Sequence, residues 1–272
     1  MNTKENKLQA FGRLLDVMDT LREKCPWDRE QTFESLRTNT IEETFELCDA
    51  ILDNDLEEIK KELGDVLLHI VFYAKMGEEQ NAFDVADVIH ALCDKLIYRH
   101  PHVYGEINAD NATAVVQNWE QLKLKEKGRK AKKTVLEGVP RSLPAMVKAT
   151  RVQEKVSAVG FDWEEREQVW DKVQEEIGEV QAEINAHDAH KTEAEFGDLF
   201  FALINAARLY GVDPEAALER TNKKFIRRFN YLEEKTIKQG QDLRQMSLEE
   251  MDKYWEEAKK EEAPSNSPEE ES

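Results

Sequence analysis

The stretch EFGDLFFALINAA, from Glu195 to Ala207, decides the fold because it joins two acidic residues to an apolar run. Nothing from Leu199 to Ile204 is polar, so we expect this part of a helix at 190–210 to be surrounded by protein. Glu195 and Asp198 stand where that run begins. An ionised carboxylate that is buried alone is strongly disfavoured, so a cation or another partner must compensate it.

The same pattern occurs a second time, in the first half of the chain. ELGD at 62–65 aligns with EFGD at 195–198, and the apolar runs that follow stay in register. Upstream and without a gap, EETFE at 42–46 aligns with EEIGE at 175–179, so both halves read EExxE, then fifteen residues, then ExxD. An internal repeat of this length predicts a tandem duplication of one unit of four or five helices.

The composition indicates an all-α protein. The chain has only 11 glycines and 7 prolines in 272 residues, and its long apolar patterns have the helical period of 3.6. A net charge of −19 argues against a nucleic-acid coat or a protein that binds anionic membranes. Three cysteines without a CxxC pair argue against a disulfide framework or a zinc ribbon. With no signal sequence and no apolar run near the ~20 residues of a membrane helix, we expect a cytoplasmic protein.

A basic segment separates the two repeats. Residues 123–145 begin with seven basic residues and one acid up to Lys133 and then gather Gly138, Pro140 and Pro144. We interpret this segment as the linker between an N-terminal helical domain at 1–122 and a C-terminal one at 146–260. We interpret its basic residues as a solvated helix end, with an electrostatic contact to RNA or another anion as the alternative. The acidic tail at 261–272 contains Pro and Ser and is predicted to be disordered.

The spacing of the acids predicts a metal site. Side chains at i and i+3 of a helix share a face, so each motif supplies two neighbouring carboxylates. A short connection favours antiparallel neighbouring helices, on which four acids converge and repel one another unless a cation binds. Oxygen ligands without Cys or His favour Mg²⁺, with Mn²⁺ as a substitute, over zinc. The candidate ligands are Glu176, Glu179, Glu195 and Asp198, with a second possible set at Glu43, Glu46, Glu62 and Asp65.

Either motif alone is typical of an ordinary solvated helix in a chain this acidic. Their repetition at one spacing, next to apolar runs, favours the metal site. Other motifs accompany them in a specific order: CPWDREQTF at 25–33, EETFELCDAI at 42–51, ELGDVL at 62–67, RHPHVY at 99–104, KTVLEGVPRSLPA at 133–145 and EFGDLFFA at 195–202. On these motifs the chain resembles the MazG family of all-α nucleoside triphosphate pyrophosphohydrolases over nearly its whole length.

The resemblance implies two MazG-like helical bundles and a homodimer. It also implies Mg²⁺-dependent hydrolysis of NTPs and dNTPs between the α and β phosphates, which yields a nucleoside monophosphate and pyrophosphate. The related all-α enzymes use the same four acids, so a specialised hydrolase of dUTP or aberrant nucleotides is an alternative. A helical interaction module that binds a GTPase or an RNA-associated regulatory protein is a second alternative.

The residues themselves favour the C-terminal repeat as the main site. Lys172 and Lys191 each lie four residues before an acid, whereas Asn39 and Glu58 occupy the corresponding N-terminal positions. A triphosphate carries about four negative charges, so basic side chains must supplement the metal. The predicted catalytic residues are Glu175, Glu176, Glu179, Glu195 and Asp198. The predicted nucleotide-binding residues are Lys172, Glu175, Lys191, Asn222, Lys224, Arg227, Arg228 and Trp255.

Some roles stay open at this level. Glu175 or one of the ligand glutamates orients the attacking water. Trp255 either stacks on the base or anchors helix packing. The intact acids of the N-terminal repeat leave open a second nucleotide site, a regulatory role or a part in dimerisation.

Overall fold

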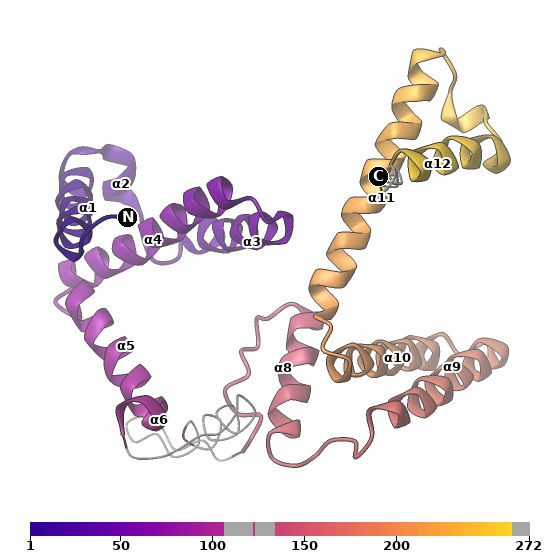
Figure 1. Ribbon diagram of the computed structural model, residues 1–272, viewed down its shortest axis with the longest axis horizontal. Coiled ribbons are helices and arrows are strands. Elements are labelled where there is room, and N and C mark those ends of the chain that lie inside the picture. Colours follow the sequence, from indigo (N-terminus) through magenta and orange to yellow (C-terminus); the bar gives the residue numbers. More distant parts are fainter. Residues whose placement is uncertain (106–121, 123–133, 263–272) are drawn as a thin grey trace, which may run out of the picture. The chain divides into compact units, whose positions relative to one another are not determined.

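The computed structural model describes residues 1–105, 122 and 134–262, and every regular element within them is helical (Figure 1). The all-α prediction is therefore confirmed. The chain divides into two compact units, Met1–Lys132 and Lys133–Ser272. The domain boundaries we drew stay predictions, since most of the linker lies outside the described residues, as do residues 263–272 of the tail. No helix in the described part of the chain is both long and apolar enough to cross a membrane.

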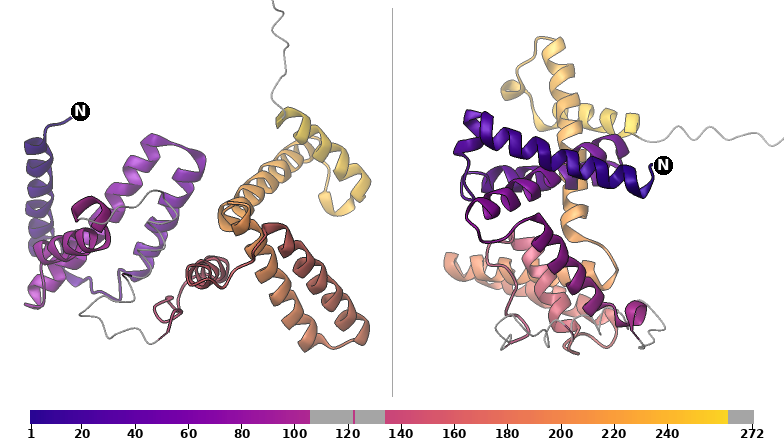
Figure 2. Two further views of the ribbon diagram at one scale, coloured as in Figure 1. Left: turned by 60° about the horizontal axis from the view of Figure 1, so that its bottom comes forward. Right: turned by 90° about the vertical axis from the view of Figure 1, so that its left-hand side faces the viewer.

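The first unit is built around a helical hairpin. The hairpin consists of α3 (Arg37–Asp53) and α4 (Leu56–Glu79), which lie side by side (Figures 1 and 2). Within its described residues this unit also contains α1 (Lys4–Lys24), α2 (Pro26–Glu30), α5 (Val85–Arg99) and α6 (Pro101–Tyr104). The apolar core joins α1 to the hairpin and contains Met18, Leu36, Val71, Phe72 and Met76.

The second unit contains the equivalent hairpin, made of α9 (Val169–Ala186) and α10 (Ala189–Leu209). Its other elements are α8 (Ala145–Ser157), the 3-10 turn η1 (Arg166–Gln168), α11 (Pro214–Lys238), the 3-10 turn η2 (Leu243–Gln245) and α12 (Leu248–Glu262). α8 packs against α10 and α11, and α12 packs along α11 (Figure 1). Buried Val169, Val173, Ala202 and Ala206 join α9 to α10.

Both hairpins close with the same turn. Asn54 and His187 occupy equivalent positions of the repeat and end α3 and α9 in the left-handed conformation, with φ of 54° and 57°. The next residue in each case is an aspartate that caps the following helix. Asp55 accepts the backbone N–H groups of residues 57 and 58 at 3.0 and 3.1 Å, and Asp188 accepts that of Lys191 at 3.1 Å. Each turn sets the register in which an EExxE helix meets an ExxD helix.

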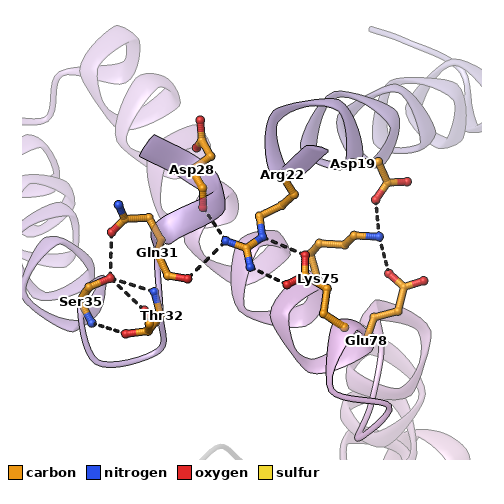
Figure 3. A network of polar contacts seen from close by, with 9 residues as sticks. Asp19, Arg22, Asp28, Gln31, Thr32, Ser35, Lys75 and Glu78 are labelled. Atoms are coloured by element: carbon orange, nitrogen blue, oxygen red, sulfur yellow. Dashed lines mark hydrogen bonds and ion pairs between the residues drawn. The ribbon is translucent and has the colours of Figure 1, made fainter. Parts of the chain in front are cut away.

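An arginine fixes the CPWD motif in the first unit (Figure 3). The Arg22 side chain on α1 donates Nε to Glu79 of α4 at 2.8 Å and Nη1 to the backbone carbonyl of Gln31 at 3.2 Å. It also donates to the backbone carbonyl of Asp28, the last residue of the motif. Arg22 therefore links α1 both to the CPWD motif and to α4.

Candidate active site

α9 and α10 bring carboxylates together in the second unit. Glu176 and Glu179 on α9 and Glu195 on α10 each offer an oxygen, and these oxygens all lie within 4.8 Å of one another. Asp198 lies one turn after Glu195 and lines the same cavity, but its oxygens are outside that group. The hairpin thus clusters three of the four predicted ligands and places the fourth beside them.

Glu176 is the buried member of the cluster. Its Oε1 lies 2.8 Å from the Lys172 ammonium, which also contacts Glu175 Oε1 at 2.9 Å. These bonds, the one to Glu176 first, raise the pKa of Lys172 above its usual range. Glu176 is 4% exposed, and its Oε2 has no hydrogen-bond partner among the described residues. Because a buried carboxylate oxygen is costly without a partner, this position favours a bound cation or donor.

Glu179 shows the repulsion within the cluster. Loss of hydration raises the pKa of its carboxyl, and the charges of Glu176 and Glu195 raise it further. Like charges at this spacing favour the protonated form, and a cation between them removes the effect.

The cluster opens into a cavity of about 910 Å³. This volume is at the upper end of the range typical of small-molecule sites. The wall carries Lys172 and the four acids. It also contains the polar residues Gln153, Asp162, Asn205 and Arg208 and the apolar and aromatic residues Val152, Val156, Phe161, Trp163, Val169, Phe201 and Ala202. A ligand with a charged group and a flat apolar group matches this lining.

Sequence reasoning missed the aromatic loop of this cavity. Gly160, at φ 90°, lets the chain leave α8. The Asp162 carboxylate then accepts hydrogen bonds from Arg208 at 2.6 and 3.0 Å, from Ser157 at 2.6 Å and from the Trp163 N–H at 3.0 Å. Burial opposes ionisation of Asp162, but these donors outweigh it and lower its pKa. The signal in the sequence was GFDW at 160–163, a glycine and two aromatic residues between helices.

Lys191 lies apart from the acid cluster. Its ammonium is 3.8 Å from Glu183 and 4.0 Å from Asp188, near the hairpin turn. It is not among the described residues that line the cavity. Glu175 does not line the cavity either, although its bond to Lys172 keeps it next to the cluster.

The predicted residues of α11 and α12 form a separate group. The Trp255 ring packs against Phe225, with ring centroids 4.9 Å apart, and the Arg228 guanidinium lies 5.8 Å from the centre of the same ring. Trp255 therefore anchors α12 on α11 in this structure. The described residues around the cavity include no member of this group, which consists of Asn222, Lys224, Arg227, Arg228 and Trp255. Their roles in nucleotide binding stay predictions.

The first unit has its own acid cluster. Oxygens of Glu43, Glu62 and Asp65 all lie within 4.8 Å of one another. Glu62 is 1% exposed, its Oε1 lies 2.8 Å from Lys61, and its Oε2 has no hydrogen-bond partner among the described residues. Burial and then the charges of Asp65, Glu46 and Glu62 raise the pKa of Glu43. Sequence reasoning missed Lys61, because it compared only the positions of the two C-terminal lysines.

The helices of the two hairpins carry different side chains next to their acid clusters. In the first unit, Thr40 Oγ1 lies 3.1 Å from His69 Nδ1 and 2.6 Å from the Tyr73 hydroxyl. The equivalent positions of the second repeat hold the apolar Val173, Ala202 and Ala206. His69 and Tyr73 of the first unit thus occupy positions at which the second unit has alanine, and Thr40 occupies the position of Val173. Ala202 itself lines the cavity.

Comparison with known proteins assigns the family. A family model described as the MazG nucleotide pyrophosphohydrolase domain matches residues 31–104 and 164–232, one segment in each unit. Each matched segment contains one of the two hairpins and its acids. Fold and matches together define the class: an all-α nucleotide pyrophosphohydrolase with tandem helical units.

Relatives match over almost the whole chain. The chain is 43% identical over 260 residues to the nucleoside triphosphate pyrophosphohydrolase of Escherichia coli K12, with 94% of this chain and 99% of that protein covered. It is 44% identical over 251 residues to the nucleoside triphosphate pyrophosphohydrolase/pyrophosphatase MazG of Thermotoga maritima, with 92% and 95% covered. The uncharacterized protein YabN of Bacillus subtilis is 43% identical over 261 residues, which cover 94% of this chain and 53% of YabN. The chain belongs to the MazG family, and the predicted resemblance and tandem repeat are confirmed.

Proposed function

We propose that this enzyme hydrolyses nucleoside triphosphates, both NTPs and dNTPs, to a nucleoside monophosphate and pyrophosphate. The bond cleaved is the one between the α and β phosphates, and the main site is in the second unit. The observation that carries the proposal is the cavity of about 910 Å³, whose wall joins the acid cluster to Lys172. The names of the E. coli and T. maritima relatives support the substrate class.

The acid cluster fits Mg²⁺, or Mn²⁺ in its place. Its donors are carboxylate oxygens, the ligands that hard cations prefer. The buried Glu176 Oε2 has no hydrogen-bond partner among the described residues, and repulsion raises the pKa of Glu179. We propose that Glu176, Glu179, Glu195 and Asp198 hold the ion. When bound, Mg²⁺ would polarise the phosphate oxygens and the attacking water.

Lys172 is a cation beside the proposed metal ligands. Its ammonium bonds to Glu175 and Glu176 and lines the cavity. In this position it would stabilise negative charge on the departing pyrophosphate. Glu175, which Lys172 holds at 2.9 Å, or one of the ligand glutamates would orient the water.

We further propose that the enzyme acts as a homodimer. On α10, Phe196, Phe200 and Leu203 follow one another at helical spacing and are exposed, as an interface stripe would be in a single chain. The basic residues of α11 do not line the cavity of their own chain. We propose that they contact nucleotide in the site of the other copy.

Mixing two inactive variants tests this arrangement. An Asp198→Asn chain lacks one proposed ligand, and an Arg228→Ala chain lacks one of the basic residues of α11. If α11 completes the partner's site, mixed dimers regain activity because one of their two sites is intact. Recovery on mixing supports the proposal, whereas variants that stay inactive under subunit exchange contradict it.

The first unit supports a second candidate function, a narrower or regulatory nucleotide site. Its cluster contains a buried oxygen of Glu62 that has no hydrogen-bond partner among the described residues. The hydrogen-bonded side chains of Thr40, His69 and Tyr73 are together bulkier than the Val173, Ala202 and Ala206 side chains at the equivalent positions of the second unit. A cytoplasmic location, a GTPase partner and other regulatory partners stay predictions.

Product analysis tests the main proposal. Purified protein with Mg²⁺ and ATP should release AMP and pyrophosphate, and Asp198→Asn should not. Release of orthophosphate instead would contradict cleavage between the α and β phosphates. A panel of nucleotides separates a broad enzyme from one restricted to dUTP or aberrant nucleotides. Absence of any Mg²⁺-dependent turnover would favour the interaction module.

A further inference from the structure

Gln153 is a buried side chain of the cavity wall with an unsatisfied oxygen. It lies on α8, is 3% exposed, and donates Nε2 to the backbone carbonyl of Phe201 at 2.8 Å. Because a carbonyl only accepts, this bond fixes which end of the amide is the nitrogen. Oε1 is shut off from bulk water and has no partner among the described residues. A buried acceptor of this kind favours a donor that a bound molecule supplies.

Much of the cavity wall is apolar and aromatic, and the Arg208 guanidinium in it is bonded to Asp162. Val152 and Val156 of α8 line the cavity, as do Phe161 and Trp163 of the following loop. Phosphate oxygens are charged acceptors, so they neither satisfy Oε1 nor bind favourably against this wall. A flat ring with an N–H group on its edge meets both requirements, because its face stacks on aromatic side chains. This chemistry describes a nucleobase.

We propose that Gln153 Oε1 accepts a hydrogen bond from the base of the bound nucleotide. The inference rests on the proposed function, since it places the substrate in this cavity. Adenine and cytosine present an amino group on the pairing edge, and guanine, uracil and thymine present a ring N–H. One acceptor therefore binds every common base and rejects a base that has no N–H group. Gln153 would thus let the site bind all common nucleobases and still discriminate against a base without an N–H group.

The test compares two uncleavable α,β-methylene triphosphates, those of adenosine and of purine riboside. Purine riboside lacks the 6-amino group and has no N–H on its base. By calorimetry with the full chain, the wild type should bind the adenosine compound about tenfold or more tightly than the other, as for one good hydrogen bond. Gln153→Met, which preserves the volume and removes the amide, should bind both alike. The same substitution at Gln174, an exposed glutamine of α9, should keep the wild-type ratio.

Several results would overturn the inference. They are equal binding of the two compounds by the wild type, binding of neither, or an unchanged ratio in Gln153→Met. If the wild type bound the adenosine and purine riboside compounds alike and lost affinity only for a 2′,3′-dideoxy analogue, Oε1 would accept its hydrogen bond from the sugar instead. Gln153→Met should also unfold near the wild-type temperature, because removal of the unsatisfied oxygen offsets loss of the bond to the Phe201 carbonyl. A lower unfolding temperature with equal loss of both ligands would indicate a structural role. Failure of the proposed function is a different result, because it would appear as no release of pyrophosphate from ATP. The binding measurement uses uncleavable compounds and requires no turnover.

Discussion

At the scale of the residue, each acid cluster contains one buried glutamate. Glu176 and Glu62 each bond to a lysine through one oxygen and leave the other buried without a hydrogen-bond partner among the described residues. The lysine compensates part of the charge, and a second cation would compensate the rest. Which glutamate of a pair is buried could not be predicted, because Glu176 aligns with Glu43 and not with Glu62.

Glu179→Gln should weaken stabilisation by Mg²⁺. The folded pKa of Glu179 is raised, so this group favours the folded state at low pH and loses that effect as pH rises through the folded pKa. At pH 7 the charge of Glu179 is repelled by the charges of Glu176 and Glu195. Without metal, the neutral variant should therefore be at least as stable as the wild type. Mg²⁺ at about 100 times its Kd stabilises one site by about 2.7 kcal/mol, and the variant should lose most of that gain.

Thermal unfolding with and without Mg²⁺ measures this difference. Glu193→Gln, at an exposed position of α10 outside the cavity, is the matched control. The control should respond to Mg²⁺ as the wild type does. An undiminished Mg²⁺ effect in Glu179→Gln would count against its role as a ligand.

Asp162→Asn should destabilise the aromatic loop. The variant loses charge-assisted bonds from Arg208 and Ser157, which we expect to cost about 2 kcal/mol at pH 7. The folded pKa of Asp162 is lowered, so its contribution is present above the ordinary value of 3.8 and disappears as pH falls through the folded pKa. Urea unfolding across this range should show the two proteins converging at acid pH. A difference that does not depend on pH would show that the carboxylate charge is not responsible.

At the scale of the element, the hairpin is the unit that positions the acid cluster. Its helices were predictable from the apolar period and the spacing of the acids, because both depend on neighbours in sequence. The loop at 160–163 was not, because Asp162 is held by Arg208, which is 46 residues away. The wall of the cavity was also unpredictable, since it required knowing that α8 packs against α10.

His187 tests the hairpin turn. It adopts a left-handed conformation at φ 57°, which glycine tolerates and a β-branched residue does not. The free energy of unfolding of the His187→Gly variant should be higher than that of the His187→Val variant by about 1–2 kcal/mol. At Ala186, the last residue of α9, the order should reverse because glycine is a poor helix former. Equal stability of the two variants at 187 would mean that the turn does not constrain the hairpin.

At the scale of the whole molecule, duplication has produced two similar units with different sites. The repeat and the family were predictable, because the motifs recur in the same order and at the same spacing in both halves. The divergence was only partly predictable. The lysines of the second unit were visible in the sequence. The bond between Lys61 and Glu62 and the contacts of Thr40 with His69 and Tyr73 required the structure. We expect the units to differ in function for this reason.

Matched substitutions in the two repeats test the location of the main site most directly. Glu195→Gln and Glu62→Gln change corresponding residues of α10 and α4 in the same way. With Mg²⁺ and ATP, Glu195→Gln should reduce pyrophosphate release by about 100-fold or more, and Glu62→Gln should retain most of it. Circular dichroism should show both variants folded. Full activity in Glu195→Gln together with loss of activity in Glu62→Gln would place the main site in the first unit and contradict our assignment.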